Sequence, residues 1–308
     1  MTKFHVSKFE GQSTSTLGYN INKKFTPDLD IRTVEFWDAT RTDLQTVVTG
    51  TGGIPKLTAL KGVLGKTLTS VSTGSAPASQ DASGNKGIVW RSDSAAEGQQ
   101  RLKFPDGLLP NAKEVLIGFV FSQGSQSSNS KLFEMSSDGT SGGISILSIF
   151  SLFGAPNNYT LSTQFISSPA SNATNLPTDG QLHCLVLHYK IGGAVSVRFD
   201  GVELSTQPQT TLKALLPVGG IGYLGSSYTG AQGVTTASNT RITHIAIAEV
   251  EPIPSVSSGI ISDKVRDRNA AEYWEASLMY AAGIQSKLPV NHSFKNSAPV
   301  TTWLGERT

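Results

Sequence analysis

Apolar residues recur through the middle of the chain in short runs that glycine and other turn residues separate. The runs follow one another about every 10–20 residues, which is typical of an antiparallel sandwich or barrel. The predicted strands are 87–91, 99–104, 114–122, 130–135, 143–150, 159–166, 181–190, 194–199, 219–224 and 240–250. In 182–187 (LHCLVL) every second residue is apolar in either register. We therefore expect that strand to be covered on both faces.

The apolar period changes after Pro252. A stripe with helical spacing comprises Ala270, Tyr273, Trp274, Ser277, Leu278 and Ala281. Ser262 or Asp263 is a suitable N-cap, and Gly283 follows the last turn at a position where glycine ends many helices. This pattern predicts a helix of about five turns that closes the sandwich or mediates a contact, followed by a polar tail over 291–308.

The N-terminal quarter carries a shorter signal. Two runs, 33–37 (TVEFW) and 44–48 (LQTVV), are rich in β-branched and aromatic residues and indicate strands. Ser, Ala and Gly dominate 71–86, which is typical of a linker or an exposed loop. The predicted organisation is an N-terminal module at 1–70, a linker at 71–86, a β-sandwich at 87–254 and a C-terminal helix and tail at 255–308.

Composition narrows the classes of function. Charged residues make up 16% of the 308 residues and the net charge is +2, so there is no basic stripe for nucleic acid. No apolar stretch is long enough to insert into a membrane. The N-terminus has no apolar segment of the secretory kind, which predicts folding in a cytosol. The lone cysteine, Cys184, is expected to be a small buried apolar residue, and it excludes an intrachain disulfide.

One stretch, 180–204, is the most specific: GQLHCLVLHYKIGGAVSVRFDGVEL. It resembles the central hairpin of concanavalin A-like and laminin G-like domains, in which a His-bearing strand leads to a turn and a second strand ends in Asp-Gly. His183 takes the histidine position, Gly192-Gly193 forms the turn and Asp200-Gly201 forms the next one. Similar strands follow at 219–225 and 241–248. The resemblance implies a mainly β fold, an antiparallel jelly-roll sandwich, and it specifies fold rather than chemistry.

The combination of a short N-terminal module and such a sandwich resembles tailed-bacteriophage virion proteins. That resemblance implies a non-enzymatic tail component that recognises a host-surface glycan or protein. Other virion proteins would bind residues 1–70, and the chain would form a homo-oligomer, a trimer by the same resemblance, inside a virion assembled in the host cytoplasm. Two alternatives stay open: a decoration protein that contacts only virion subunits, and a glycan-degrading enzyme.

Aromatic rings and amides in predicted loops are the candidate ligand contacts, because sugars stack on rings and hydrogen bond to amides. The candidates are Asn157, Asn158, Tyr159, Ser227 and Tyr228. No cofactor is expected. Laminin G-like domains often hold calcium near the rim, and Asp138 is the candidate ligand by that resemblance, although an Asp-Gly turn explains it more simply.

Catalytic carboxylates of sandwich glycosidases stand at alternate positions of one strand. The nearest pairs here are Asp28 with Asp30 and Glu249 with Glu251. Neither pair has a third member, so we interpret them as solvated charges at strand ends. The interval between His183 and His188 is odd, so the two rings face opposite sides of the strand and do not share a metal. We expect His183 to pack and hydrogen bond.

Overall fold

A computed structural model gives the fold of the chain. It describes residues 29–74, 76–90, 100–108, 114–123, 130–136, 145–151, 158–163, 170–175, 177, 179–190, 194–208, 221–225, 240–252 and 263–295. Within these ranges, no helix is both long enough and apolar enough to cross a membrane.

The first layer of strands is centred on β17, which pairs with β8 along one edge and with β1 and β6 along the other. β1 (Leu29–Asp38) and β6 (Lys86–Val89) lie one after the other along one edge of β17 (Arg241–Pro252). On the other side of β17 the order is β8 (Glu114–Ser122), β13 (His183–Lys190), β14 (Ala194–Phe199) and β15 (Val202–Pro208). Every one of these pairings is antiparallel.

The second layer is a meander that begins at β12. In order across it, the strands are β12 (Ala170–Asn175), β11 (Asn158–Thr163), β10 (Ser145–Ser151), β9 (Ser130–Ser136), β16 (Ile221–Leu224) and β7 (Leu102–Lys103). These pairings are antiparallel too, which confirms the predicted mainly β, antiparallel sandwich.

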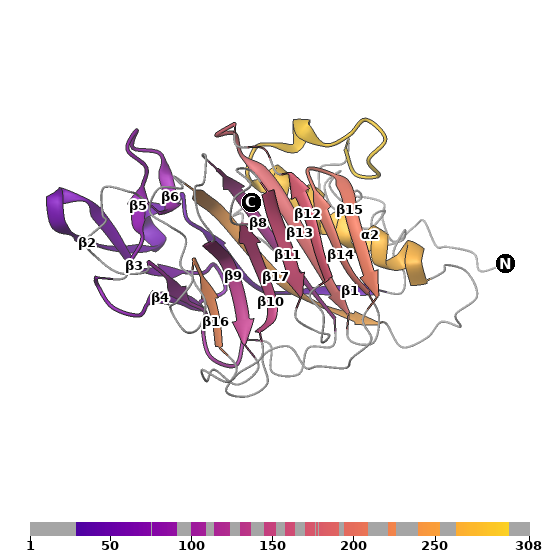
Figure 1. Ribbon diagram of the computed structural model, residues 1–308, viewed down its shortest axis with the longest axis horizontal. Coiled ribbons are helices and arrows are strands. Elements are labelled where there is room, and N and C mark those ends of the chain that lie inside the picture. The colour runs from indigo at the N-terminus through magenta and orange to yellow at the C-terminus, as the bar shows by residue number, and fades with distance from the viewer. Residues whose placement is uncertain are drawn as a thin grey trace, which may run out of the picture.

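Four short strands at one end connect the two layers. They are β2 (Gln45–Thr49), β3 (Pro55–Lys61), β4 (Thr67–Ser70) and β5 (Ala78–Gln80), with single 3-10 turns at Thr42–Leu44 and Thr51–Gly53. β7 pairs with β4, β4 with β3, β3 with β5, and β5 with β6, which leads to β17. β2 pairs with β3. In Figure 1 these strands gather at the left in indigo and purple.

The N-terminal strands share the core of the sandwich, so the predicted boundaries at 70 and 86 are revised. Trp37, Leu57 and Leu68 are fully buried in the same cluster as residues of β8, β13 and β17. Ala76 and Ala78, inside the predicted linker, are fully buried as well. Small side chains are common in linkers, but here they let β5 pack closely between β3 and β6.

A second core lies between the first layer and helix α2 (Asp263–Ala281). Alternate residues of β13 enter different cores: Leu185 joins the first, and Cys184 and Val186 join the second. The prediction that this strand is covered on both faces is therefore confirmed. At Gly118 of β8, an added Cβ would lie 2.6 Å from Leu278, so the helix approaches the sheet where a side chain is missing.

The predicted helix and its end are confirmed. Gly283 has φ 70°, the amide of Gly283 donates to the Tyr280 carbonyl over 3.0 Å, and the amide of Ile284 donates to Met279 over 2.9 Å. These two bonds form a Schellman cap. After a 3-10 turn at Gln285–Lys287 the chain runs back over the helix, and Leu288 and Phe294 pack into the second core.

Candidate functional site

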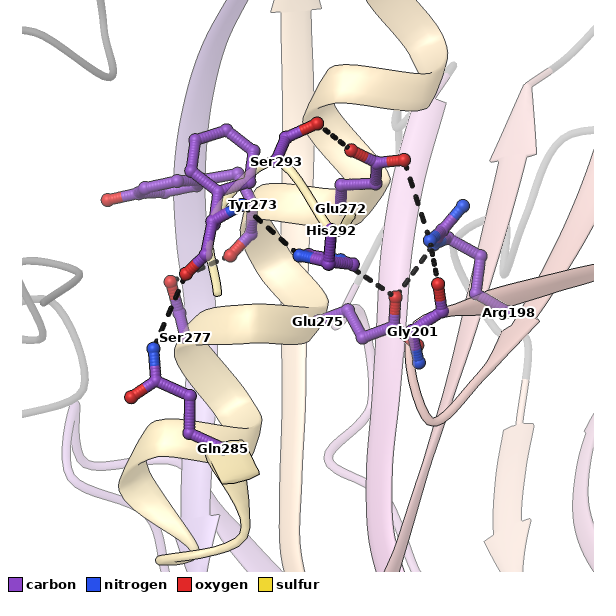
Figure 2. A network of polar contacts seen from close by, with 10 residues as sticks. Arg198, Gly201, Glu272, Tyr273, Glu275, Ser277, Gln285, His292 and Ser293 are labelled. Carbon is purple, nitrogen blue, oxygen red and sulfur yellow. Dashed lines mark hydrogen bonds and ion pairs between the residues drawn. The ribbon is translucent and has the colours of Figure 1, made fainter. Parts of the chain in front are cut away.

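An open pocket of about 320 Å³ lies where the β14–β15 turn meets the segment that follows helix α2. Its lining combines charged, amide and apolar side chains: Arg198, Gly201, Val202, Glu203, Glu272, Pro289, Asn291 and His292. Figure 2 shows the polar network that forms its floor, with contributions from the strand, the helix and the C-terminal segment.

Arg198 points from β14 towards the helix. The preceding residue, Val197, enters the first core, and side chains alternate along a strand. Arg198 Nε donates to Glu275 Oε2 over 2.7 Å, and Nη2 donates to the Gly201 carbonyl over 2.8 Å. Arg198 is 4% exposed and Glu275 is fully buried, so this is a buried ion pair that links strand and helix.

Glu275 also holds the turn between β14 and β15. Its Oε1 accepts the Gly201 amide over 2.6 Å. Asp200 and Gly201 have φ of 46° and 87°, the left-handed conformations of a tight hairpin turn that favours Asp-Gly. A Cβ at Gly201 would lie 2.3 Å from Pro289. The turn therefore requires glycine both for its backbone and for its contact with the C-terminal segment.

Glu272 and His292 complete the floor. Glu272 accepts a hydrogen bond of 2.5 Å from the Ser293 hydroxyl and lies 3.6 Å from Arg198 Nη2. His292 Nδ1 accepts the Phe294 amide over 3.2 Å, which places the ring proton on Nε2. That nitrogen is buried, lies 3.7 Å from Glu275 Oε2 and has no hydrogen-bond partner among the described residues.

A second polar cluster adjoins the pocket through Asp200. His183 Nδ1 lies 2.6 Å from Asp200 Oδ2, its Nε2 lies 3.0 Å from Asp179 Oδ1, and its ring stacks on Phe199. Burial lowers the pKa of His183, but the hydrogen bonds to Asp200 and then to Asp179 outweigh it, so the pKa is raised overall. The hydrogen-bonding role predicted for His183 is confirmed.

His188 is on the other face of β13, as predicted, where it binds Glu114 over 2.8 Å in a buried pair. Cys184 is fully buried in the second core, as expected, and burial raises the pKa of its thiol well above the ordinary value. Within the described ranges, no group of three or more His, Cys, Asp and Glu side chains is arranged to hold a metal ion.

Two of the predicted ligand contacts lie in a strand. Asn158 and Tyr159 begin β11, where they pair with Asn175 and Thr174 of β12. The other candidates lie outside the described residues: Asn157, Ser227, Tyr228 and the calcium candidate Asp138. Their proposed roles stay predictions.

The register of β1 and β17 places Asp30, the described member of one predicted carboxylate pair, opposite a member of the other pair. Asp30 lies opposite Glu251, and Arg32 lies opposite Glu249. All four are at positions that share the face of Ile247, a residue of the first core.

Sequence reasoning missed the floor of the pocket, although two signals were present. Arg198 interrupts an apolar strand, and Glu272 and Glu275 recur at i and i+3 on a helix. The predicted stripe described only one face of that helix, whereas Glu272 and Glu275 are buried too, under the returning C-terminal segment.

No family model and no curated protein matches the chain. Among solved structures, it is similar to domain 4 of AbnA, a GH43 extracellular arabinanase from Geobacillus stearothermophilus, in complex with arabinotriose. That likeness has 18% identity and a TM-score of 0.45, and covers 78% of this chain and 99% of that one. The chain is also similar to a Trypanosoma rangeli sialidase in complex with a difluoro-KDN compound, with 11% identity and a TM-score of 0.49. That likeness covers 89% of this chain and 40% of the sialidase.

A further similar structure is the binding domain of botulinum neurotoxin DC in complex with rat synaptotagmin II, with 9% identity and a TM-score of 0.37. That likeness covers 79% of this chain and 46% of the toxin domain. The chain thus spans less than half the length of the sialidase and of the toxin domain. These neighbours bind carbohydrate or a protein receptor, or belong to enzymes. The class that the fold itself defines is an antiparallel β-sandwich with a C-terminal helix.

Proposed function

We propose that this protein is a non-enzymatic recognition component of a tailed-phage virion, whose sandwich binds a glycan or a protein on the host surface. The observation that carries the recognition role is the open pocket beside helix α2. Hydrogen-bonding groups of Arg198, Glu203 and Asn291 stand there beside apolar Val202 and Pro289. Small-molecule sites combine a few placed polar groups with apolar surface in this way.

The contacts of the buried carboxylates support a role without catalysis. Glu35 accepts the backbone amides of Leu64 and Lys66, Glu114 pairs with His188, and Glu275 pairs with Arg198. Each is engaged in holding a turn or joining two elements. A general acid or base instead needs an open path to substrate within hydrogen-bond reach.

Assembly into a virion is part of the same proposal. Attachment to other virion proteins is assigned to residues 1–70, of which 29–70 also belong to the sandwich, and the assembled form is taken to be a trimer. The low content of charged residues, 16%, with many Ser, Thr and Gly, suits a particle surface that meets neutral polymers. Immunogold labelling of particles tests the location, with label expected at the outer end of the tail.

Binding of the full chain to host cells and to a glycan array tests recognition. We expect saturable binding to host cells and competition with phage adsorption. Absence of binding to the host surface and to its polysaccharides would refute the proposal, and label buried between virion subunits would favour a decoration protein.

Incubation with host polysaccharide, followed by measurement of reducing ends, tests the absence of catalysis. We expect no release above a heated sample. Release that disappears in the Glu249→Gln/Glu251→Gln variant would instead assign an active site to the carboxylates on β1 and β17.

A further inference from the structure

Strand β2 forms an outer edge of the sandwich. It pairs with β3 along one side, and no other strand among the described residues pairs with it. Figure 1 shows it at the left end of the molecule. Residues 46–49 are all exposed, and the exposed fractions of Val47 and Val48 are 41% and 36% although both side chains are apolar. The strand therefore presents both its side chains and one backbone edge to its surroundings.

The backbone groups of Val47 and Thr49 point away from β3. Residue pairs in an antiparallel ladder alternate between pairs that exchange two hydrogen bonds and pairs that exchange none. Val47 lies opposite Leu57, whose amide donates over 2.8 Å to the carbonyl of Pro77 on the far side of β3. Thr49 lies opposite Pro55, which has no amide hydrogen. Both are therefore pairs without hydrogen bonds, and the N–H and C=O groups of Val47 and Thr49 face the outer edge.

This edge has few of the features that keep natural edge strands apart. Exposed edges are usually protected by lysine, by proline, by bulges or by a covering segment. The sequence of β2, 45–49 (QTVVT), has no charged residue and no proline. Residues 46–49 are all β-branched, which suits an extended strand. A register shift between Thr46 and Val47 limits the regular edge to Val47–Thr49. The edge is thus short, but it is suited to accept another strand.

We infer that β2 pairs with β2 of a second copy of this chain, antiparallel, about a two-fold axis at Val48. In this register Val47 of each copy lies opposite Thr49 of the other, and each of these two pairs exchanges two hydrogen bonds. All the outward backbone groups of Val47 and Thr49 are then matched. The strand is uncharged, and Asp43, which precedes it, is bonded to Arg41 of its own copy. The two copies therefore meet without like-charge repulsion, and this self-complementarity assigns the second copy as the partner.

This two-fold contact is independent of the proposed recognition role and separate from the proposed three-fold assembly. It joins two isolated chains, or one chain of a trimer to a chain of another trimer. In either case pairing doubles the mass of the assembled unit. The contact is short, in the class of weak interfaces that bury less than about 1,200 Å². We therefore expect the association to be reversible and to depend on concentration.

Sedimentation equilibrium of the full chain over about 1–200 µM tests the pairing. The average mass of the wild type should rise with concentration towards twice its value in dilute solution. Val47→Lys/Thr49→Lys places like charges directly opposite each other in both pairs, so this variant should keep the dilute mass throughout. Tyr280→Lys/Val290→Lys is the matched control, because it adds the same charge at residues that are 41% and 87% exposed, on and after helix α2. It should behave as the wild type does.

An equimolar mixture of Val47→Lys/Thr49→Lys with Val47→Glu/Thr49→Glu tests the register itself. Each variant alone should keep the dilute mass, and the mixture should associate again because opposite charges then face each other. A variant that had merely lost the β2 fold could not be restored in this way. A wild-type mass that does not rise with concentration, a rise that survives the double lysine change, or a mixture that stays at the dilute mass would each overturn the inference. Host-cell binding is measured separately, so its presence or absence decides the proposed function and not this contact.

Discussion

Arg198 sits in β14 between Val197, which enters the first core, and Phe199, which packs against it. The strand itself was predictable, because alternation of apolar residues is local in the sequence. The partner of Arg198 was not, because Glu275 is 77 residues further along the chain. Only the packing of helix α2 on the sheet brings the two together. A buried charge in a strand thus predicts that a partner exists without saying which residue it is.

His183 links three parts of the chain at the residue scale. It joins Asp179 before β13 to Asp200 after β14, and the pKa of its imidazole is raised. The charged ring is thus favoured in the folded state. Its stabilising contribution is complete below the pKa of the unfolded chain, about 6.5, and is lost as the pH rises through the higher folded-state pKa.

We therefore expect the His183 contribution to the free energy of unfolding to decrease between pH 6 and pH 8. Urea unfolding of the wild type and of His183→Gln at both pH values measures it as the difference between the two proteins. The comparison is needed because burial lowers the pKa of His244. The contribution of His244 to the free energy of unfolding is therefore complete above its unfolded-state pKa and is lost as the pH falls through its lower folded-state pKa. A difference that grows with pH would contradict the assignment.

At the scale of elements, helix α2 is held to the sheet by an apolar core and by the buried Arg198, which pairs with Glu275 over 2.7 Å and lies 3.6 Å from Glu272. The apolar part was predictable from the stripe that includes Trp274 and Leu278, both fully buried. The polar part was not, because burial of Glu272 and Glu275 depends on the C-terminal segment folding back over the helix. The sequence from 291 onwards, polar in composition, gave no sign that His292 and Phe294 would be buried.

Breaking the ion pair from one side should be costly. Glu275→Gln leaves the Arg198 guanidinium buried without its counter-ion and weakens the bond to the Gly201 amide, so we expect a loss of about 3–5 kcal/mol in the free energy of unfolding. Replacing both partners, as Arg198→Met/Glu275→Leu, should cost less than the sum of the two single changes. Denaturant unfolding of the four proteins measures the coupling, and strict additivity would show that the pair is not coupled.

At the scale of the whole molecule, strands from the first quarter of the chain and from its middle belong to one layer in the described residues. β17 pairs with β1 and β6 as well as with β8, so strands from the first 90 residues and from the middle of the chain meet on it. The predicted boundary at 71–86 relied on composition, which does not report how closely small residues pack. The sandwich was predictable from the alternation of apolar residues. The burial of Ala76 and Ala78 inside the predicted linker was not, because composition alone does not show that these residues pack between strands.

A single unfolding transition should follow from this shared core. We expect near-UV and far-UV circular dichroism to change at the same denaturant concentration, because Trp37 of β1 and Trp274 of α2 are both fully buried on β17 and its neighbours. Limited proteolysis within 76–90 should be slow under native conditions. Two separate transitions, or rapid cleavage there with survival of a stable C-terminal fragment, would restore a two-domain description.

Cys184 is the only cysteine of the chain, and it lies between sheet and helix with no exposed surface and a raised pKa. A thiol reagent can reach it only when α2 leaves the sheet or the whole sandwich opens. The rate at which the Cys184 thiol is modified in native buffer therefore measures how often these openings occur. Occupation of the neighbouring pocket, which bridges helix and strand, should slow this modification.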